Sequence, residues 1–255
     1  HSDVRARVKE TPQYRRATSF ASMDSPGPFE RRATEAYYYV TPPENDWPAK
    51  QKEEWLTAFN DYASDIISIH EVYPGHYVQF LKLNASAATK VEKIFGSYAF
   101  IEGWAHYCEQ MMIDEGFGRA PGAKPSDQEV KRAAKYRMAQ SAQALLRLCR
   151  LCVSIQMHTQ NMSIEEATKF FRQNCYYEEK PAHAEAMRGA FDPGYLNYTL
   201  GKLQILKLRD DYKAQQGSQF SLQKFHNELL SHGMPPIRLL REIMLKDKAK
   251  WGEVL

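Results

Sequence analysis

The sequence lacks an apolar run of the roughly 18 residues that a membrane-spanning helix needs, and its first residues, HSDVRARVKETPQYRR, contain no apolar core of a signal peptide. It has no run of five or six Lys or Arg residues, and its formal charge of +3 is a mild imbalance. These absences argue against a membrane span and against nucleic acid as a partner. Two locations stay open: the cell envelope or periplasm if an upstream signal has been removed, and otherwise the cytoplasm.

Cysteine is scarce and does not follow a metal-binding pattern. Cys149 and Cys152 form a single CxxC inside an apolar helical pattern, and Cys108 and Cys175 do not make a second pair of that kind. A chain of 255 residues with 43% hydrophobic residues is large enough to fold without disulfides. We therefore expect buried thiols here, with a redox or zinc role as the alternative.

The N-terminal part, residues 1–49, has an irregular pattern that is rich in proline. It contains one β-prone run, Ala36–Val40, which Pro42 and Pro43 follow closely and which they predict to lie at a sheet edge. An edge strand can bind an extended peptide by strand addition, so Tyr39 is a candidate substrate-binding residue at the edge of the cleft. The alternative is a short strand that only packs on helices.

Residues 50–255 follow a helical pattern almost throughout, without internal repeats or low-complexity segments. The expected helices are one that runs from about Trp55 into His70, Val91–Met112, Gln128–His158 after a Ser126 cap, one after the Ser163/Glu166 capping box, Gly194–Tyr212, one from Ser221, and one after Pro235-Pro236. The sequence therefore predicts a mainly α fold. We expect one helical catalytic domain of the metallopeptidase kind over residues 50–255, with residues 1–49 packed on it as a small β element, and this domain as part of a longer protein.

The segment HEVYPGH, from His70 to His76, resembles the helical zinc motif HExxH but has a longer spacing. On a regular helix six residues turn by roughly 600°, so the two histidines would point about 120° apart. Pro74 and Gly75 predict that the helix is broken or bulged between them. A bulge absorbs extra residues without advancing the face, so His76 would return to the side of His70.

A second segment, EGWAHYCEQ, supplies the remaining groups of a catalytic zinc site. Glu102, His106 and Glu109 recur at steps of four and three on one face of an otherwise apolar helix. Such groups are costly to bury unless they are paired or bound to metal, so Glu102 is the candidate third ligand beside His70 and His76. Glu71 would then be the general base. Glu109 would orient a ligating imidazole, and His106 could either do the same or bind the metal.

Both segments also resemble the central motifs of a bacterial family catalogued as domain of unknown function 885. The resemblance extends to QMHTQNMSIEEATKFF, FDPGYLNYTLGKLQILKLRDDY and FHNELLSHGMPPIRLLRE. It implies a fold similar to that of gluzincin-type zinc metallopeptidases, with His70, His76 and Glu102 as zinc ligands and Glu71 as base. Members of the family are about twice as long, so the chain resembles their C-terminal catalytic half.

Peptide hydrolysis further needs a donor for the oxyanion of the tetrahedral intermediate. The candidates are Tyr195 and Tyr198, with Arg209 on the same predicted helix, and the resemblance implies that this segment lies near the site. Arg188 could instead pair with a substrate carboxylate, because guanidinium groups bind carboxylates in a bidentate manner. For either tyrosine, core packing is the alternative.

The sequence as a whole predicts a Zn²⁺-dependent hydrolase, with a peptide as the expected substrate and a water molecule activated by Glu71. One alternative is a zinc hydrolase that acts on another small amide or on an ester. An alternative from another class is a metal-free helical binding or scaffold module. The N-terminal half of a longer parent protein is a further expected partner.

Overall fold

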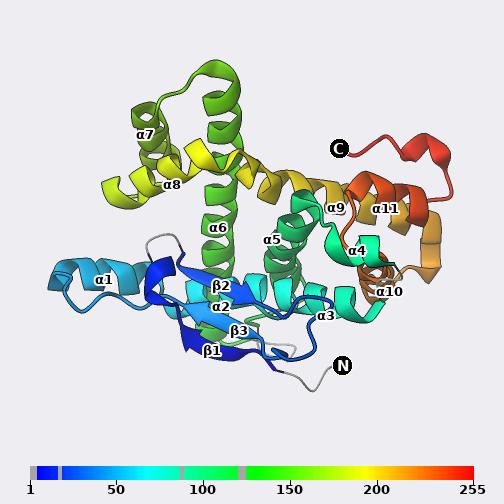
Figure 1. The fold of residues 1–255 in the computed structure, drawn as a ribbon, viewed down its shortest axis with the longest axis horizontal. Coiled ribbons are helices and arrows are strands. Elements are labelled where there is room, and N and C mark those ends of the chain that lie inside the picture. Colours follow the sequence, from blue (N-terminus) through cyan, green and yellow to red (C-terminus); the bar gives the residue numbers. More distant parts are fainter. Residues whose placement is uncertain (1–4, 17–18, 87–88, 120–124) are drawn as a thin grey trace. The chain divides into compact units, whose positions relative to one another are not determined.

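The computed structural model describes residues 5–16, 19–86, 89–119 and 125–255, and this part of the chain is mainly helical (Figure 1). The strands are β1 (Arg7–Glu10), β2 (Ala21–Asp24) and β3 (Tyr37–Val40). The helices are α1 (Ala49–Ala58), α2 (Asp61–Glu71), α3 (His76–Ser86), α4 (Lys90–Ile94), α5 (Tyr98–Asp114), α6 (Asp127–Gln160), α7 (Ile164–Asn174), α8 (Glu179–Phe191), α9 (Asn197–Gln216), α10 (Leu222–Leu229) and α11 (Ile237–Met244). In the described ranges, none of these helices has the length and apolarity that crossing a membrane requires. The predicted mainly α fold with a small N-terminal β element is confirmed.

The chain divides into two compact units. The first contains residues 1–95, 108–139 and 230–234, and the second contains residues 96–107, 140–229 and 235–255. Helices α5 and α6 are each continuous and contribute residues to both units. These boundaries differ from the predicted division between residues 49 and 50, which stays a prediction.

The three-stranded sheet of the first unit has the order β1-β3-β2. Strand β3 pairs in parallel with β1 and antiparallel with β2, so it lies at the centre. The prediction that this strand lies at an edge is therefore wrong. Pro42 and Pro43 come after Val40, the last residue of the strand, and remove no hydrogen bond from its ladder. Strand addition to β3 is not available, because both of its edges are occupied.

One face of this sheet packs against the helices that carry the HEVYPGH segment (Figure 1). Ala36 and Tyr38 are buried there in one cluster with Val72 and Tyr77. Alternation along a strand sends every second side chain to the same face, which puts Ala36 and Tyr38 together. The small sheet therefore supports the segment between α2 and α3.

Two of the expected helices are each divided in the structure. The predicted helix into His70 ends as α1 and restarts as α2 at Asn60, whose side chain accepts hydrogen bonds from the N–H groups of Tyr62 and Ala63, both at 3.1 Å. The predicted Val91–Met112 helix is split into α4 and α5. Thr89 begins α4 through a capping box with Glu92. The polar cap Asn60 thus begins a new helix inside a pattern that apolar spacing alone would have continued.

The second unit has a core formed by α6, α7, α8 and the start of α9. Its buried cluster includes Val153, Phe171, Ala186 and the thiols of Cys149 and Cys175. The predicted capping boxes begin α6 at Ser126 and α7 at Ser163, as expected. Helix α8 was not predicted. The four cysteines are free thiols, of which Cys108, Cys149 and Cys175 are buried and Cys152 is half-buried, in agreement with the expected structural role.

Candidate metal centre

The HEVYPGH segment contains a full break between two helices. Helix α2 ends at Glu71 and α3 begins at His76, and the Tyr73–Pro74 peptide bond between them is cis. The N–H of Gly75 donates to the carbonyl of Ile69 at 3.0 Å, so the chain folds back on the end of α2. Of the two predicted arrangements, a broken or a bulged helix, the structure shows the break, and the two histidines lie on the same side.

Gly75 is at a point where two backbones nearly touch. A Cβ atom at this position would lie 1.7 Å from the carbonyl oxygen of His70. No side chain fits into that space, so glycine is required by the close approach of the segment to the last turn of α2. This contact holds the start of α3 against the end of α2.

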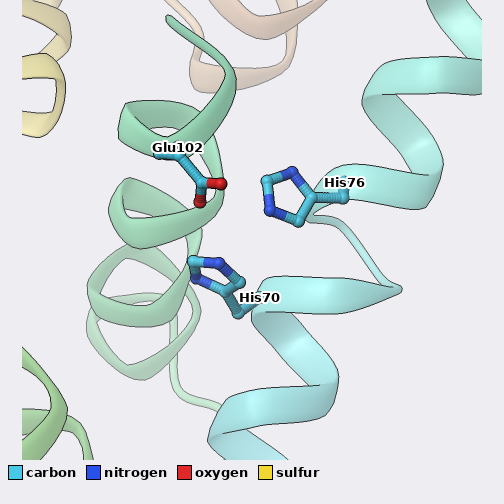
Figure 2. A group of neighbouring side chains, drawn as sticks. All are labelled: His70, His76 and Glu102. Carbon is cyan, nitrogen blue, oxygen red and sulfur yellow. The ribbon is translucent and has the colours of Figure 1, made fainter. Parts of the chain in front are cut away.

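Three side chains meet where these helices face α5 (Figure 2). His70, His76 and Glu102 each offer one ligand atom, and these atoms all lie within 4.8 Å of one another. The two imidazole rings are 4.8 Å apart between centroids and nearly perpendicular. Both histidines are buried and Glu102 is half-buried. The predicted ligand set is thus brought together from three helices.

Glu109 fixes the orientation of His70. Its Oε1 atom lies 2.7 Å from Nδ1 of His70, and both side chains are almost fully buried. Because a carboxylate only accepts, Nδ1 carries the proton and Nε2 of His70 keeps its lone pair for a metal. Glu102 precedes Glu109 by seven residues on the continuous helix α5, so both carboxylates project from nearly the same face.

The other groups of the predicted centre lie close in sequence to these ligands. His106 is 1% exposed and follows Glu102 by one helical turn. Glu71 is the last residue of α2 and is half-buried. Its charge acts on the phenol of Tyr38 in the same unit.

Tyr198 is positioned by close packing of α5 on α9 in the second unit. A Cβ atom at Gly103 would lie 2.5 Å from the backbone of Gly201, so the two helices approach without side chains between them. Tyr198 lies one turn before Gly201. Burial raises the pKa of Tyr198, and the charge of Glu102 raises it further. The phenol is therefore protonated at neutral pH and lies close enough to Glu102 to feel its charge.

Arg188 lies next to this tyrosine, and its role in binding a substrate carboxylate stays a prediction. Its Nη2 atom donates to the hydroxyl of Tyr198 at 3.3 Å, and Asp192 accepts from the same guanidinium group. The structure thus brings Arg188 and Tyr198 together, with Glu102 as their charged neighbour.

Tyr195 belongs to the same buried cluster as Tyr198. Its side chain is 0% exposed inside the core of the second unit, and its hydroxyl lies against Gly189 of α8. Burial raises the pKa of Tyr195, and the nearby charge of Glu185 raises it further. This burial agrees with the alternative, core packing, and the role of Tyr195 as an oxyanion donor stays a prediction.

Arg209 also lies elsewhere. It donates to the hydroxyl of Tyr107 at 3.4 Å, and that hydroxyl contacts Nε2 of His226 at 2.9 Å. Tyr107 follows Glu102 by five residues, which turns it roughly 140° away around α5. The structure therefore gives no support for Arg209 as a substrate-binding residue of this centre.

Tyr39 points to the face of the sheet opposite the candidate centre. It stacks on Tyr37 with a centroid distance of 5.8 Å and lines an open hollow with it. Tyr38 instead faces α2 and its hydroxyl lies 3.2 Å from Oγ of Ser68. Burial raises the pKa of Tyr38 to about 12, to which the charge of Glu71 contributes. The structure therefore gives no support for Tyr39 as a substrate-binding residue of this centre, and Tyr38 is the residue of β3 that faces α2.

Comparison with known proteins gives a family and a fold. The profile of a family described as "Bacterial protein of unknown function (DUF885)" matches residues 1–244. The chain belongs to this family. Among curated proteins, none matches this DUF885 chain.

Two solved structures are similar to it. One is a candidate lipoprotein of unknown function from Shewanella oneidensis, with 29% identity and a TM-score of 0.78 over 95% of this chain and 40% of its own. The other, a candidate lipoprotein from Colwellia psychrerythraea, has 24% identity and a TM-score of 0.78 over 94% of this chain and 37% of its own, and shows the fold alone. The DUF885 chain thus spans less than half the length of either protein.

Proposed function

We propose that this chain is a zinc-dependent hydrolase and that its substrates are peptides. The observation that carries the proposal is the set of two imidazoles and one carboxylate whose ligand atoms lie within 4.8 Å of one another. Catalytic zinc sites use three protein ligands of these types and leave a position open. The adjacent Glu71 supports hydrolysis over a purely structural metal site.

The donor set fits zinc in chemistry and in spacing. Bonds of about 2.0–2.2 Å to one ion separate two ligand atoms by roughly 3–4 Å, which is slightly less than the upper limit of 4.8 Å here. The hydrogen bond from His70 to Glu109 is the kind of contact that orients a metal-binding imidazole. Mixed imidazole and carboxylate ligands would also accept other divalent transition metals.

Different residues of this chain would have different roles in hydrolysis. A zinc ion held by His70, His76 and Glu102 would polarise the substrate carbonyl and lower the pKa of a water molecule towards 7. The carboxylate of Glu71 would accept the proton of that water and pass it to the leaving amine. The protonated hydroxyl of Tyr198 would donate to the oxygen on which negative charge develops.

The proposal also covers the relationship of this chain to other proteins and its location in the cell. The HExxPGH and EGWA segments with this ligand set support a relationship to gluzincin-type metallopeptidases. The two similar structures are named as candidate lipoproteins, which supports a location in the cell envelope. Because the chain spans less than half of those proteins, a longer parent chain would contribute further walls to the cleft.

Two alternatives have distinct signatures. A zinc hydrolase of small amides or esters would hold the same metal and cleave such compounds but not peptides. A metal-free binding module would hold no stoichiometric metal. The buried ligand set argues against the second, because ionisable groups that are costly to bury have no role in a module without metal.

Metal content per chain, measured by elemental analysis, tests the site. We expect about one zinc in the wild type and in Glu71→Gln, and none in His76→Ala. His183→Ala, which changes an exposed histidine, is the matched control and should keep its zinc. Full zinc content in His76→Ala would disprove the ligand set, and a wild type that stays without zinc after reconstitution would favour the binding module.

Peptide cleavage by the zinc-loaded protein then tests the reaction. Glu71→Gln should abolish cleavage while zinc is retained. Tyr198→Phe should lower kcat roughly 100- to 1,000-fold, as loss of an oxyanion donor does, with KM nearly unchanged. Cleavage that survives Glu71→Gln would remove this residue from the reaction.

A further inference from the structure

Three arginine side chains surround the ring of Tyr198 in the second unit. The guanidinium carbons of Arg147, Arg150 and Arg188 lie 5.8, 5.2 and 5.9 Å from the ring centroid. Arg147 and Arg150 come from α6, and Arg188 comes from α8. Packing of the phenol ring alone does not explain why three positively charged groups lie beside it.

Arg150 has a structural role. It forms a bidentate pair with Glu185, through Nε at 2.8 Å and Nη2 at 2.7 Å, and both side chains are only 9% exposed. This pair keeps the pKa of Glu185 low although burial alone would raise it. Because Arg150 is buried and its Nε and Nη2 atoms bind a buried carboxylate, it is not accessible to a ligand.

Arg188 is arranged differently. Asp192 accepts from both Nε and Nη2 with a single oxygen, Oδ2, at 3.2 and 3.1 Å, and Nη2 also donates to Tyr198. Within the described ranges, Nη1 makes no hydrogen bond, and the side chain is 30% exposed. The guanidinium group is thus fixed in position on one side and keeps donors for a ligand on the other.

The charges around Arg188 favour an anion. Among Arg147, Arg150, Arg188, Glu185 and Asp192, three side chains are cationic and two are anionic. Glu102 is the third carboxylate nearby, and the proposed function assigns it to the metal. Asp192 and Tyr198 accept from Nε and Nη2 of Arg188, which leaves the N–H groups of Nη1 able to bind a second carboxylate.

We propose that Arg188 binds a carboxylate group of the substrate next to the metal centre. The inference rests on the proposed hydrolase function and names its substrate class: peptides with a carboxylate close to the bond that is cleaved. Tyr198 connects the two places: its hydroxyl contacts Arg188, and its ring lies 6.1 Å, between centroids, from that of Tyr98, one turn before Glu102 on α5. The carboxylate is either the C-terminal group of the peptide or the side chain of an Asp or Glu residue.

Binding of three dansyl tripeptides to the zinc-loaded Glu71→Gln protein, which does not turn over, tests this inference. The first, Gly-Ala-Leu, ends in a free carboxylate, the second is its C-terminal amide, and the third is Gly-Ala-Glu amide. We expect one of the two peptides with a carboxylate to bind roughly 10- to 100-fold more tightly than the Leu amide, the range that hydrogen bonds to a charged group supply. Preference for the first would identify the C-terminal carboxylate, and preference for the third would identify the acidic side chain.

Variants at Arg188 test whether this residue causes the preference for a carboxylate. Arg188→Gln should remove it, and Arg188→Lys, which keeps the charge without the fork, should retain only part of it. Arg172→Gln, which changes an exposed arginine of α7 paired with Glu179, is the matched control and should keep the full preference. Because Arg188→Lys preserves the contact with Asp192 in part, it remains informative if Arg188→Gln unfolds.

The two proposals fail in different ways. Equal binding of all three peptides, or a preference that survives both Arg188 variants, would overturn the carboxylate site even if peptides are cleaved. A preference that depends on Arg188 in a protein that cleaves no peptide would instead remove the hydrolase function and leave the carboxylate site in place.

Discussion

Glu109 shows how a residue can act on the candidate centre without being a ligand. It is 0% exposed, and its contact with Nδ1 of His70 offsets part of the cost of burying a carboxylate. The same contact sets which nitrogen of His70 is free for a metal. At the scale of single residues, hydrogen bonds of this kind decide what each side chain can do.

Replacing Glu109 with Gln should weaken zinc binding roughly 10- to 100-fold, the usual effect of losing such a partner. A neutral amide polarises the imidazole less than a carboxylate does. Competition with a chromogenic chelator measures the affinity. Glu115→Gln, which changes an exposed carboxylate just after α5, is the control, and equal affinities in the two variants would contradict the assigned role.

His226 predicts a pH dependence of stability. Burial lowers the pKa of His226 to about 4, and the positive charge of Arg209 contributes. The unfolded chain, with a histidine pKa of about 6.5, binds a proton more readily, so the free energy of unfolding should fall as the pH drops from about 6.5 to about 4. The full shift corresponds to roughly 3 kcal/mol.

Urea unfolding at pH 7.5 and at pH 4.5 checks this expectation. His226→Gln keeps a donor for Tyr107 but cannot be protonated, so it should lose less stability than the wild type between the two pH values. An equal loss in both proteins would exclude His226 as the source.

At the scale of helices, the candidate centre depends on breaks and close approaches more than on regular structure. The gap between α2 and α3 turns two histidines with an unfavourable spacing towards each other. Gly103 and Gly201 let α5 and α9 approach, which brings Tyr198 beside Glu102. An unbroken helix from His70 to His76, or a side chain at Gly103 or Gly201, would separate the groups.

Gly75→Ala should therefore disrupt the centre. The new Cβ would overlap the carbonyl oxygen of His70, so α3 must move away from α2, at a cost of at least about 1–3 kcal/mol. We expect a lower free energy of unfolding together with weaker zinc binding. Gly27→Ala in the same unit adds a methyl group to open space and serves as the control. Wild-type stability in Gly75→Ala would show that the approach is not required.

At the scale of the whole molecule, α5 and α6 are each shared by two compact units. The proposed ligands His70, His76 and Glu102 come from three helices, α2, α3 and α5, that follow one another along the chain. A metal bound by all three would stabilise the native chain as a whole, since the unfolded chain does not bring the ligands together.

Zinc should accordingly raise the melting temperature of the metal-free protein. At a free zinc concentration 100 times Kd, the expected stabilisation is about 2.7 kcal/mol. Differential scanning calorimetry with and without zinc measures the shift, which His76→Ala should abolish and His183→Ala should retain. A shift of equal size in His76→Ala would indicate that zinc binds elsewhere.

The sequence by itself determined which residues are candidates for the metal centre and where most of the helices lie. The residues His70, His76 and Glu102 carried recognisable chemistry, and caps such as Ser163 marked where helices begin, because both depend on a few neighbouring residues. Periodicity also placed Glu102 and Glu109 on one face of α5. These features are local, and local spacing is what a sequence expresses directly.

The tertiary structure alone decided which partner each face meets. It placed Arg188 next to Tyr198, and it placed Arg209 of α9 next to Tyr107 instead. It also put β3 at the centre of its sheet. Helical spacing fixes the direction of a side chain around its own axis, but the neighbour on that side is set by packing between segments that lie far apart in the chain.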